Sequence, residues 1–162
     1  MLSNVILDLA IRNIISTTGN CDKIKSLPAI KMIDIHQIKY YKFSTQYDSL
    51  IIPVNVSNIH WILLVFEFKV ETLHILDPSP QRITITPEKI FAKLLKNNWK
   101  IDTHRHTIPK QNQNTLDCGV FVIKYAQNFI IYNNFREISF DVDTERTNLK
   151  KYFERLVSTL TI

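Results

Sequence analysis

WILLVFEFK, residues 61–69, is the most hydrophobic strand candidate in the sequence. Five apolar residues follow one another in it, Ile62–Phe66, so both faces of such a strand are apolar. A strand of that kind is typical of the centre of a sheet. Thr72–Leu76 predicts a second strand, which can form a hairpin with the first through residues 69–71 and which ends at Asp77.

Two further stretches are predicted to extend this sheet. Ser49–Val56 has the pattern of a strand, and Pro53 within it favours a place at the sheet edge, because proline cannot donate a hydrogen bond to a neighbouring strand. Trp99–Ile108 is also strand-like. Asp34–Tyr41 is compatible with either a short helix or a strand.

Helices are predicted before and after the hairpin. Residues 4–16 have helical periodicity, with a polar start at Ser3 or Asn4 and a stop near Gly19. Pro87–Trp99 has the pattern of an amphipathic helix.

Two more helices are predicted towards the end of the chain. Gly119–Tyr132 is long, has no glycine or proline in its interior and follows Asp117, which favours a buried helix over a strand. The last helix has apolar residues at steps of three and four: Leu149, Tyr152, Phe153, Leu156, Val157 and Leu160. The layout predicts an α+β fold with a small mixed central sheet flanked by helices.

The composition of the 162 residues fits a single domain, residues 1–162. Apolar residues make up 45% of the chain and charged residues 22%, which is ordinary for a globular protein. Only two glycines and two cysteines occur. These counts exclude a dinucleotide fingerprint and leave no candidate for a glycine-rich phosphate loop. They also exclude a multi-bridge disulfide framework and a four-thiolate zinc site.

The net charge of +5 permits association with nucleic acid or another acidic partner without requiring it. No apolar run reaches membrane-spanning length, and the N-terminus lacks the pattern of a signal peptide. We therefore expect an intracellular protein that has no membrane partner and is not secreted through a signal peptide. Its richness in Ile, Lys and Asn resembles products of AT-rich genomes, as in many viruses and intracellular parasites.

Three residues could carry chemistry. If a helix begins at Cys118, unpaired backbone N–H groups and the helix dipole favour a thiolate there. His60 stands at the start of the most hydrophobic strand, and Asp77 ends the next strand, seventeen positions on. If these strands are antiparallel neighbours, Asp77 could hold the His60 imidazole in the right tautomer and orientation.

Each of the three has an ordinary structural explanation when it is taken alone. Cys118 could be a buried core cysteine, His60 an edge histidine, and Asp77 a turn residue before a proline. Together they form the arrangement of a thiol hydrolase, with a nucleophile, a base and a group that orients the base. The chain order His, Asp, Cys differs from that of papain, in which the cysteine comes first.

In this order and spacing the sequence resembles the ubiquitin-like-protein cysteine proteases, which include SUMO proteases and related bacterial deubiquitinases, and the adenovirus-type maturation proteases. The matching segments are residues 52–55 leading to His60-Trp61, Leu76-Asp77, Asn114 with residues 117–121, the first helix at residues 2–14, and the closing helix at 141–156 with Arg146. The resemblance implies the fold of those proteases.

The resemblance also implies roles for individual residues. Cys118 would be the nucleophile, His60 the general base and then acid, and Asp77 the group that orients the histidine. The backbone N–H of Cys118 would be one oxyanion donor. Trp61 would pack beside the histidine, and the missing side chain of Gly119 would let another backbone approach the sulfur closely.

A carboxamide before the cysteine is expected to be a second oxyanion donor. Adenovirus-type enzymes carry a glutamine seven residues before it, which matches Gln111, and an asparagine four before it, which matches Asn114. Most SUMO-protease relatives carry the glutamine six residues before it, where this chain has Asn112. We expect Gln111 to be the donor, with Gln113 as the alternative, and Asn114 to contact substrate.

The implied function is a cysteine protease that hydrolyses peptide or isopeptide bonds after a small, glycine-type residue through a thioester, with no metal or organic cofactor. The favoured substrate is a viral structural precursor such as a capsid protein, met in a virion or in host cytoplasm or nucleus. The alternative is ubiquitin or a ubiquitin-like protein, cleaved by a deconjugating enzyme of an intracellular bacterium or parasite. An acetyltransferase with the same triad and a binding module with a decayed triad are further alternatives.

The remaining histidines are weaker candidates. His104 and His106 would share one face of a strand, a spacing that suits a metal, but without a third ligand pattern they are expected to be surface histidines. His74 and His36 have no partner that the sequence identifies. Cys21 is expected to be a bystander.

Overall fold

The computed structural model describes residues 2–79, 95, 98–104, 106–112, 115–136 and 138–160, with the side chains at 156, 157, 159 and 160 excepted. Its elements in chain order are α1 (Asn4–Thr17), β1 (Ile24–Ser26), β2 (Ile30–Lys31), the 3₁₀ helices η1 (Met32–Gln37) and η2 (Tyr40–Lys42), β3 (Ser49–Val56), β4 (His60–Glu67), β5 (Thr72–Leu76), β6 (Lys100–Asp102), α3 (Cys118–Tyr132) and α4 (Val142–Leu160).

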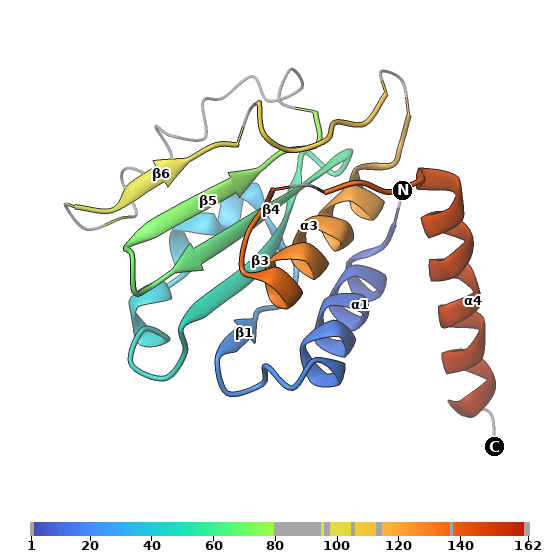
Figure 1. The fold of residues 1–162 in the computed structure, drawn as a ribbon, viewed down its shortest axis with the longest axis horizontal. Coiled ribbons are helices and arrows are strands. Elements are labelled where there is room, and N and C mark those ends of the chain that lie inside the picture. Colours follow the sequence, from blue (N-terminus) through green and yellow to red (C-terminus); the bar gives the residue numbers. More distant parts are fainter. Residues whose placement is uncertain are drawn as a thin grey trace.

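The strands form one mixed sheet in the order β1-β3-β4-β5-β6, and β2 also pairs with β3 (Figure 1). Strand β4 is antiparallel to both of its neighbours, β3 and β5, whereas β1 and β2 run parallel to β3 and β6 runs parallel to β5. Strand β4 therefore lies in the middle, as its continuous apolar run predicts. The mixed sheet with flanking helices confirms the predicted α+β fold.

Alternate residues of β4 pack into two cores, one on each face of the sheet. Trp61, Leu63 and Val65 face the core that α1 and α3 cover, and the two helices lie side by side on that face (Figure 1). Ile62 and Leu64 face the opposite core, which the two 3₁₀ helices cover. The two-residue period of a strand thus explains why no position in the run is polar.

Pro53 corrects the prediction that β3 lies at an edge. Strand β3 pairs with β4 along its whole length, and on its other side β1 reaches only Ile51 while β2 begins at Val54. The proline falls in the interval between these two short strands, where no neighbour requires its missing N–H. A proline can therefore lie inside this sheet because the pairing on one side is interrupted.

The predicted helices at both ends of the chain are confirmed. Helix α1 starts after Ser3, whose hydroxyl accepts a hydrogen bond from the N–H of Ile6, and Gly19 just beyond its end has a φ of +71°. Helix α3 is largely buried, and Leu149 and Phe153 of α4 pack against the same core.

Other predictions are changed or lie outside the described residues. Asp34–Tyr41 is largely 3₁₀ helix, and the strand expected at Trp99–Ile108 is limited to the three residues of β6. Most of the helix predicted at Pro87–Trp99 is outside the described residues.

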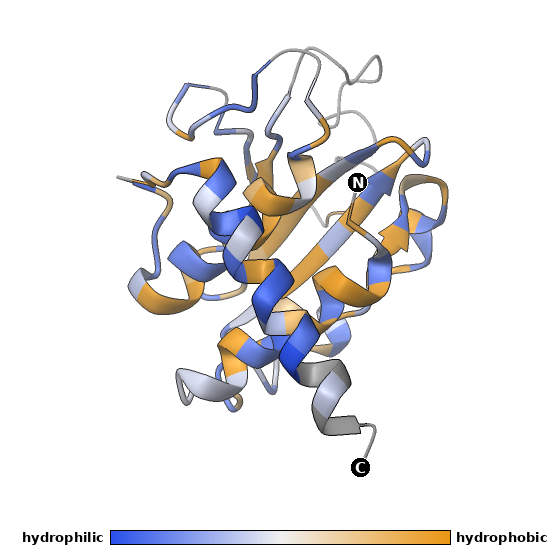
Figure 2. Cartoon of the chain, turned by 90° about the vertical axis from the view of Figure 1, so that its right-hand side faces the viewer, coloured by the Kyte–Doolittle hydropathy of each residue, from blue (hydrophilic) through white to orange (hydrophobic). Residues whose placement is uncertain are grey.

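Helix α4 lies on the outside of the molecule and is mostly hydrophilic on its outer surface (Figure 2). Among the described residues, no helix is both long enough and apolar enough to span a membrane.

Candidate active site

A tight turn between β3 and β4 positions His60. Ser57 and Asn58 in this turn have positive φ angles of 53° and 60°, and the pairing of His60 with Val56 closes it. The turn is confined to residues 57–59, because β3 continues to Val56 and β4 begins at His60. His60 therefore begins β4, as predicted, and its side chain is buried.

Asp77 lies directly after the neighbouring antiparallel strand β5, so its carboxylate reaches the histidine. Its Oδ1 is 2.7 Å from His60 Nε2 and also accepts a hydrogen bond of 2.7 Å from the backbone N–H of Ser79. Both side chains are almost completely shielded from solvent. The predicted proximity of the start of one strand and the end of the next is thus observed.

Cys118 begins helix α3, as predicted, and its thiol is free and buried. A sulfur in the first turn lies near the positive end of the helix dipole, which favours a thiolate. Cys21, the other cysteine, is free and exposed and belongs to no cluster with these residues.

The His60 imidazole is held ready to carry a positive charge. Burial by itself lowers its pKa, but hydrogen bonding and charge from Asp77 and Cys118 outweigh burial and raise the pKa to about 9. Its Nδ1 is buried without a hydrogen-bond partner at normal distance among the described residues. One ring nitrogen is therefore fixed by Asp77, and the other is left for the thiol.

Arg146 links the outer helix to the residue before Cys118. Its guanidinium pairs with the carboxylate of Asp117 and, at 2.7 Å, with that of Asp143. Asp117 is buried and precedes the first turn of α3, so the ion pair acts on the backbone that carries the sulfur. Arg146 and Asp117 could both be found in the sequence as part of the resemblance, but their pairing across 29 positions of the chain could not.

Gln111 is the carboxamide that the structure places in this region. Its backbone N–H donates to Pro78 O at 3.2 Å, and its side-chain N–H donates weakly to Thr115 O at 3.4 Å. The side chain is buried, and its Oε1 has no partner among the described residues. Asn112 is exposed, while Gln113 and Asn114 lie outside the described residues.

Trp61 and Gly119 are buried and both contact Leu2 near the N-terminus. The Trp61 indole is fully buried and donates to Leu2 O at 3.1 Å. A Cβ added at Gly119 would lie 3.0 Å from the side chain of Leu2. The expectation of a second backbone at Gly119 is therefore corrected: the space it leaves is filled by the Leu2 side chain.

The histidines expected at the surface are arranged differently. His104 follows β6 in a turn with a φ of 49°, so it does not share a strand face with the exposed His106. It faces His74 instead, at 2.9 Å between His104 Nε2 and His74 Nδ1. Burial lowers the pKa of His104 to about 4 and also lowers that of His74, so both rings are neutral near pH 7.

A buried imidazole with a raised pKa, an orienting carboxylate and a thiol at a helix start are the parts needed for nucleophilic attack by sulfur. The imidazolium stabilises a neighbouring thiolate and can later supply a proton to a leaving group.

Comparison with known proteins agrees with this chemistry. The Ulp1 protease family, C-terminal catalytic domain, matches residues 31–160. SUMO protease Ulp1 with its catalytic cysteine oxidized to a sulfenic acid has a TM-score of 0.69 at 16% identity, covering 99% of this chain and 78% of that chain. The Ulp1 protease domain in complex with Smt3, the yeast ortholog of SUMO, has a TM-score of 0.63 at 15% identity, covering 89% and 71%. The ASFV pS273R protease has a TM-score of 0.62 at 14% identity, covering 90% and 64%. No curated protein matches the chain by sequence.

Proposed function

The chain belongs to the Ulp1 protease family and is a cysteine protease, and we propose that Cys118, His60 and Asp77 form its catalytic triad. One observation carries this assignment: Asp77 holds His60 by Nε2 at 2.7 Å, and the buried Nδ1 has no partner at normal hydrogen-bond distance in the part of the chain that the structure describes. Cys118 acts on the same ring closely enough to raise its pKa. The unpaired nitrogen is therefore the one that exchanges a proton with the thiol or with the leaving group.

In the proposed first half-reaction, the Cys118 thiolate attacks the scissile carbonyl carbon and a C–S bond forms. The backbone N–H of Cys118 and the side-chain amide of Gln111 donate to the resulting oxyanion. The His60 imidazolium gives its proton to the leaving nitrogen as the C–N bond breaks, which leaves a thioester on Cys118.

In the second half-reaction, water attacks the thioester carbonyl and passes a proton to neutral His60. The C–S bond then breaks, which releases the carboxylic acid product and restores the thiolate and the imidazolium. Asp77 keeps one tautomer and orientation of the ring throughout the cycle.

We propose that cleavage follows a small, glycine-type residue, in line with the resemblance noted from the sequence. The favoured substrate is a viral structural precursor, which the position of Gln111 seven residues before Cys118 supports. A ubiquitin-like protein is the second candidate, supported by membership of the Ulp1 family and by the neighbour in complex with Smt3. A viral precursor would meet the enzyme in a virion or in host cytoplasm or nucleus, and a ubiquitin-like protein would meet it inside a cell. Association with nucleic acid stays a prediction from the net charge of +5.

A substrate screen with the purified chain tests these proposals. We expect cleavage of quenched peptides with glycine before the scissile bond and not with leucine there. Cys118→Ala should lower the rate on the order of 10⁶-fold, and Cys21→Ala, at the exposed cysteine, should leave it unchanged. Unchanged activity in Cys118→Ala contradicts the nucleophile assignment.

Suicide probes based on ubiquitin and SUMO separate the two substrate classes. Labelling of Cys118 by either probe would replace the viral precursor with a ubiquitin-like protein as the substrate. Peptide cleavage without probe labelling supports the precursor class. Turnover of acetyl-CoA without peptide cleavage would favour the acetyltransferase alternative.

A further inference from the structure

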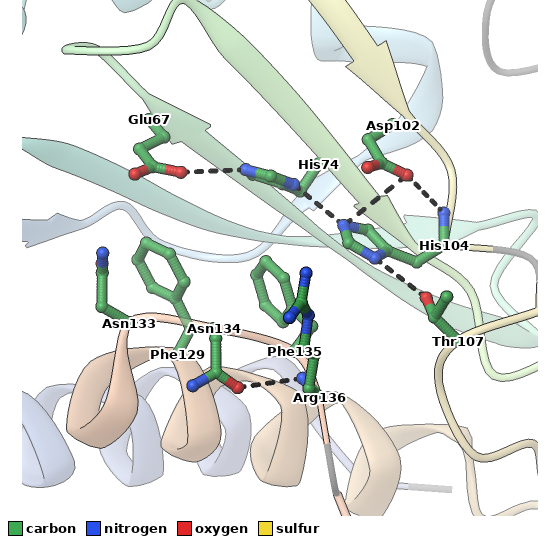
Figure 3. Close-up of a pocket in the computed structure, with 10 residues that line it drawn as sticks. All are labelled: Glu67, His74, Asp102, His104, Thr107, Phe129, Asn133, Asn134, Phe135 and Arg136. Carbon is green, nitrogen blue, oxygen red and sulfur yellow. Dashed lines mark hydrogen bonds and ion pairs between the residues drawn. The ribbon is translucent and has the colours of Figure 1, made fainter.

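A second cluster of side chains, none of which belongs to the proposed triad, lies at the β5–β6 edge of the sheet (Figure 3). It contains His74 of β5, Asp102 at the end of β6 and His104 in the following turn. The cluster lines a pocket of about 310 Å³, whose opposite wall includes Phe129 and Phe135. These side chains take no part in the mechanism above.

The three possible ligand atoms of this cluster lie close to one another. One atom from each residue lies within 4.8 Å of the other two, with 2.9 Å between the facing nitrogens of His74 and His104 and 3.8 Å from His104 Nε2 to Asp102 Oδ1. Tetrahedral zinc with bonds of about 2.0–2.1 Å needs ligand atoms roughly 3.3 Å apart. These two distances lie on either side of that value and the third does not exceed 4.8 Å, so side-chain rotation can bring the three atoms to a common ion.

The second nitrogen of each histidine is also held by a partner. His74 Nε2 is 3.1 Å from the carboxylate of Glu67, and His104 Nδ1 is 3.1 Å from the hydroxyl of Thr107. Metal-binding histidines commonly have such an outer partner, which fixes the ring and directs the free lone pair at the ion. Here both outer contacts leave His74 Nδ1 and His104 Nε2 aimed at each other (Figure 3).

Without a metal, the same contacts form a chain of hydrogen bonds between neutral rings. His74 donates from Nε2 to Glu67, so its Nδ1 accepts from His104 Nε2, whose own Nδ1 accepts from Thr107. A cation can replace the proton between the two rings if His104 moves that proton to Nδ1 and donates to the Thr107 oxygen instead. Both rings stay neutral in this exchange. Glu67 and Asp102 supply negative charge beside Arg136, which also lines the pocket.

We propose that His74, Asp102 and His104 bind one divalent transition-metal ion of the zinc type, with the remaining coordination position open to the pocket. Two imidazoles and one carboxylate are ligands that Zn²⁺ takes in proteins. The ion would tie β5 to β6 and to the segment that leads to the triad. Lys110 in that segment donates to the backbone oxygens of both His104 and Asp77.

Metal titration of the full-length chain tests this site. Cys21→Ala and Cys118→Ala are introduced first, because thiolates bind zinc and because the result is then independent of the proposed triad. We expect one equivalent of Zn²⁺ or Co²⁺ to bind, with visible ligand-field bands of cobalt and no thiolate-to-cobalt charge-transfer band. His74→Gln and His104→Gln should each weaken binding by ~100-fold or more, and Glu67→Gln by about 10–100-fold.

Two exposed histidines provide matched controls. His106→Gln, two residues from His104, and His36→Gln should leave the affinity unchanged. Histidine ring signals in the NMR spectrum give a second measurement that needs no substitution at the site: zinc should shift the signals of His74 and His104 and not those of His36 and His106. Binding weaker than millimolar, equal losses in His106→Gln and His104→Gln, or equal shifts of all histidines would overturn the proposal.

Discussion

Two regions of the molecule place a histidine near an aspartate, and they hold the histidine in opposite protonation states. Burial disfavours the charged ring in both, yet the pKa of His60 is raised to about 9 and that of His104 is lowered to about 4. Asp77 lies 2.7 Å from the His60 nitrogen, whereas Asp102 lies 3.8 Å from His104 Nε2, whose hydrogen bond is with His74. For His60, Asp77 and Cys118 together outweigh desolvation, whereas for His104 the more distant carboxylate does not. A hydrogen-bonded carboxylate alone is not enough, because burial still lowers the pKa of His74 although Glu67 lies 3.1 Å from its Nε2.

The two protonation states suit different chemistry. A charged imidazole beside a thiol stabilises a thiolate and can donate a proton, whereas neutral imidazoles keep lone pairs for a cation. Strand β5 contributes to both regions, since it carries His74 and leads into Asp77. The partners of each ring, Asp77 and Cys118 for His60 and a second histidine for His104, therefore separate the two regions.

Among the substitutions that test why the two histidines differ in pKa, Asp77→Asn should have the largest effect. Asp77→Asn keeps the shape of the side chain but removes the charge that raises the pKa of His60. We expect that pKa to fall well below about 9, because burial, which lowers it, is then opposed only by Cys118. The rate kcat/KM should fall by about 10³–10⁴-fold. Peptide cleavage and NMR titration of the His60 ring measure the two effects.

The pKa of His104 serves as an internal control in the same variant, since its causes do not include Asp77. Asp22→Asn, at an exposed aspartate, is the matched substitution and should change neither quantity. A variant Asp77→Asn in which His60 still titrates near pH 9 would remove Asp77 as the cause of the difference.

The second prediction concerns Gln111. It follows Lys110, which donates to the backbone oxygens of both Asp77 and His104. Gln111→Ala should lower kcat by about 10²-fold with little change in KM, as expected for the loss of one oxyanion donor. Asn112→Ala is the matched control, because Asn112 is the exposed neighbour at the spacing typical of most SUMO-protease relatives. A larger loss in Asn112→Ala would reassign the donor to Asn112.

The third prediction uses the sign of the His60 shift. A raised pKa means that His60 stabilises the folded state fully below pH 6.5, and that this contribution is lost as the pH rises through about 9. The shift of the pKa corresponds to about 3 kcal/mol in the free energy of unfolding. Urea unfolding of the parent and of His60→Gln at pH 6, 8 and 10 should therefore show a difference that shrinks with rising pH. A difference that grows towards pH 10 would contradict the raised pKa.

Much of the region around Cys118, His60 and Asp77 could be predicted from the sequence, because these residues lie at the ends of strongly patterned helices and strands. The apolar run at Ile62–Phe66 identifies the central strand, and its hairpin with Thr72–Leu76 brings Asp77 back to His60. Cys118 follows from the long apolar helix that it begins. In each case local periodicity, the strongest signal in a single sequence, determines the position of the residue.

The cluster of His74, Asp102 and His104 could not be predicted, because no local sequence pattern links its residues. His74 is a half-buried residue midway along β5. His104 lies in an irregular turn after a strand of three residues. Their contact depends on the parallel pairing of β5 with β6, which joins segments about thirty residues apart in the chain. The position of Pro53 escaped prediction for a similar reason, since it depends on where two short neighbouring strands stop.

The smallest expected effect tests whether the triad region also depends on a helix outside it. Arg146→Ala removes the partner of buried Asp117, and because the Arg146 side chain is 54% exposed, the cost in the free energy of unfolding should stay below about 1 kcal/mol. A few-fold fall in kcat with unchanged KM is expected, because the ion pair restrains the backbone just before Cys118.

Arg146→Lys should restore only part of the rate, since an ammonium cannot replace the fork of the guanidinium, which pairs with both Asp117 and Asp143. Lys150→Ala removes an exposed ion pair with Glu154 on the same helix and is the matched control. If Lys150→Ala lowers kcat as much as Arg146→Ala, the effect belongs to helix α4 as a whole. If only Arg146→Ala does so, and the pKa of His60 stays at about 9, the contact positions the sulfur without tuning the imidazole.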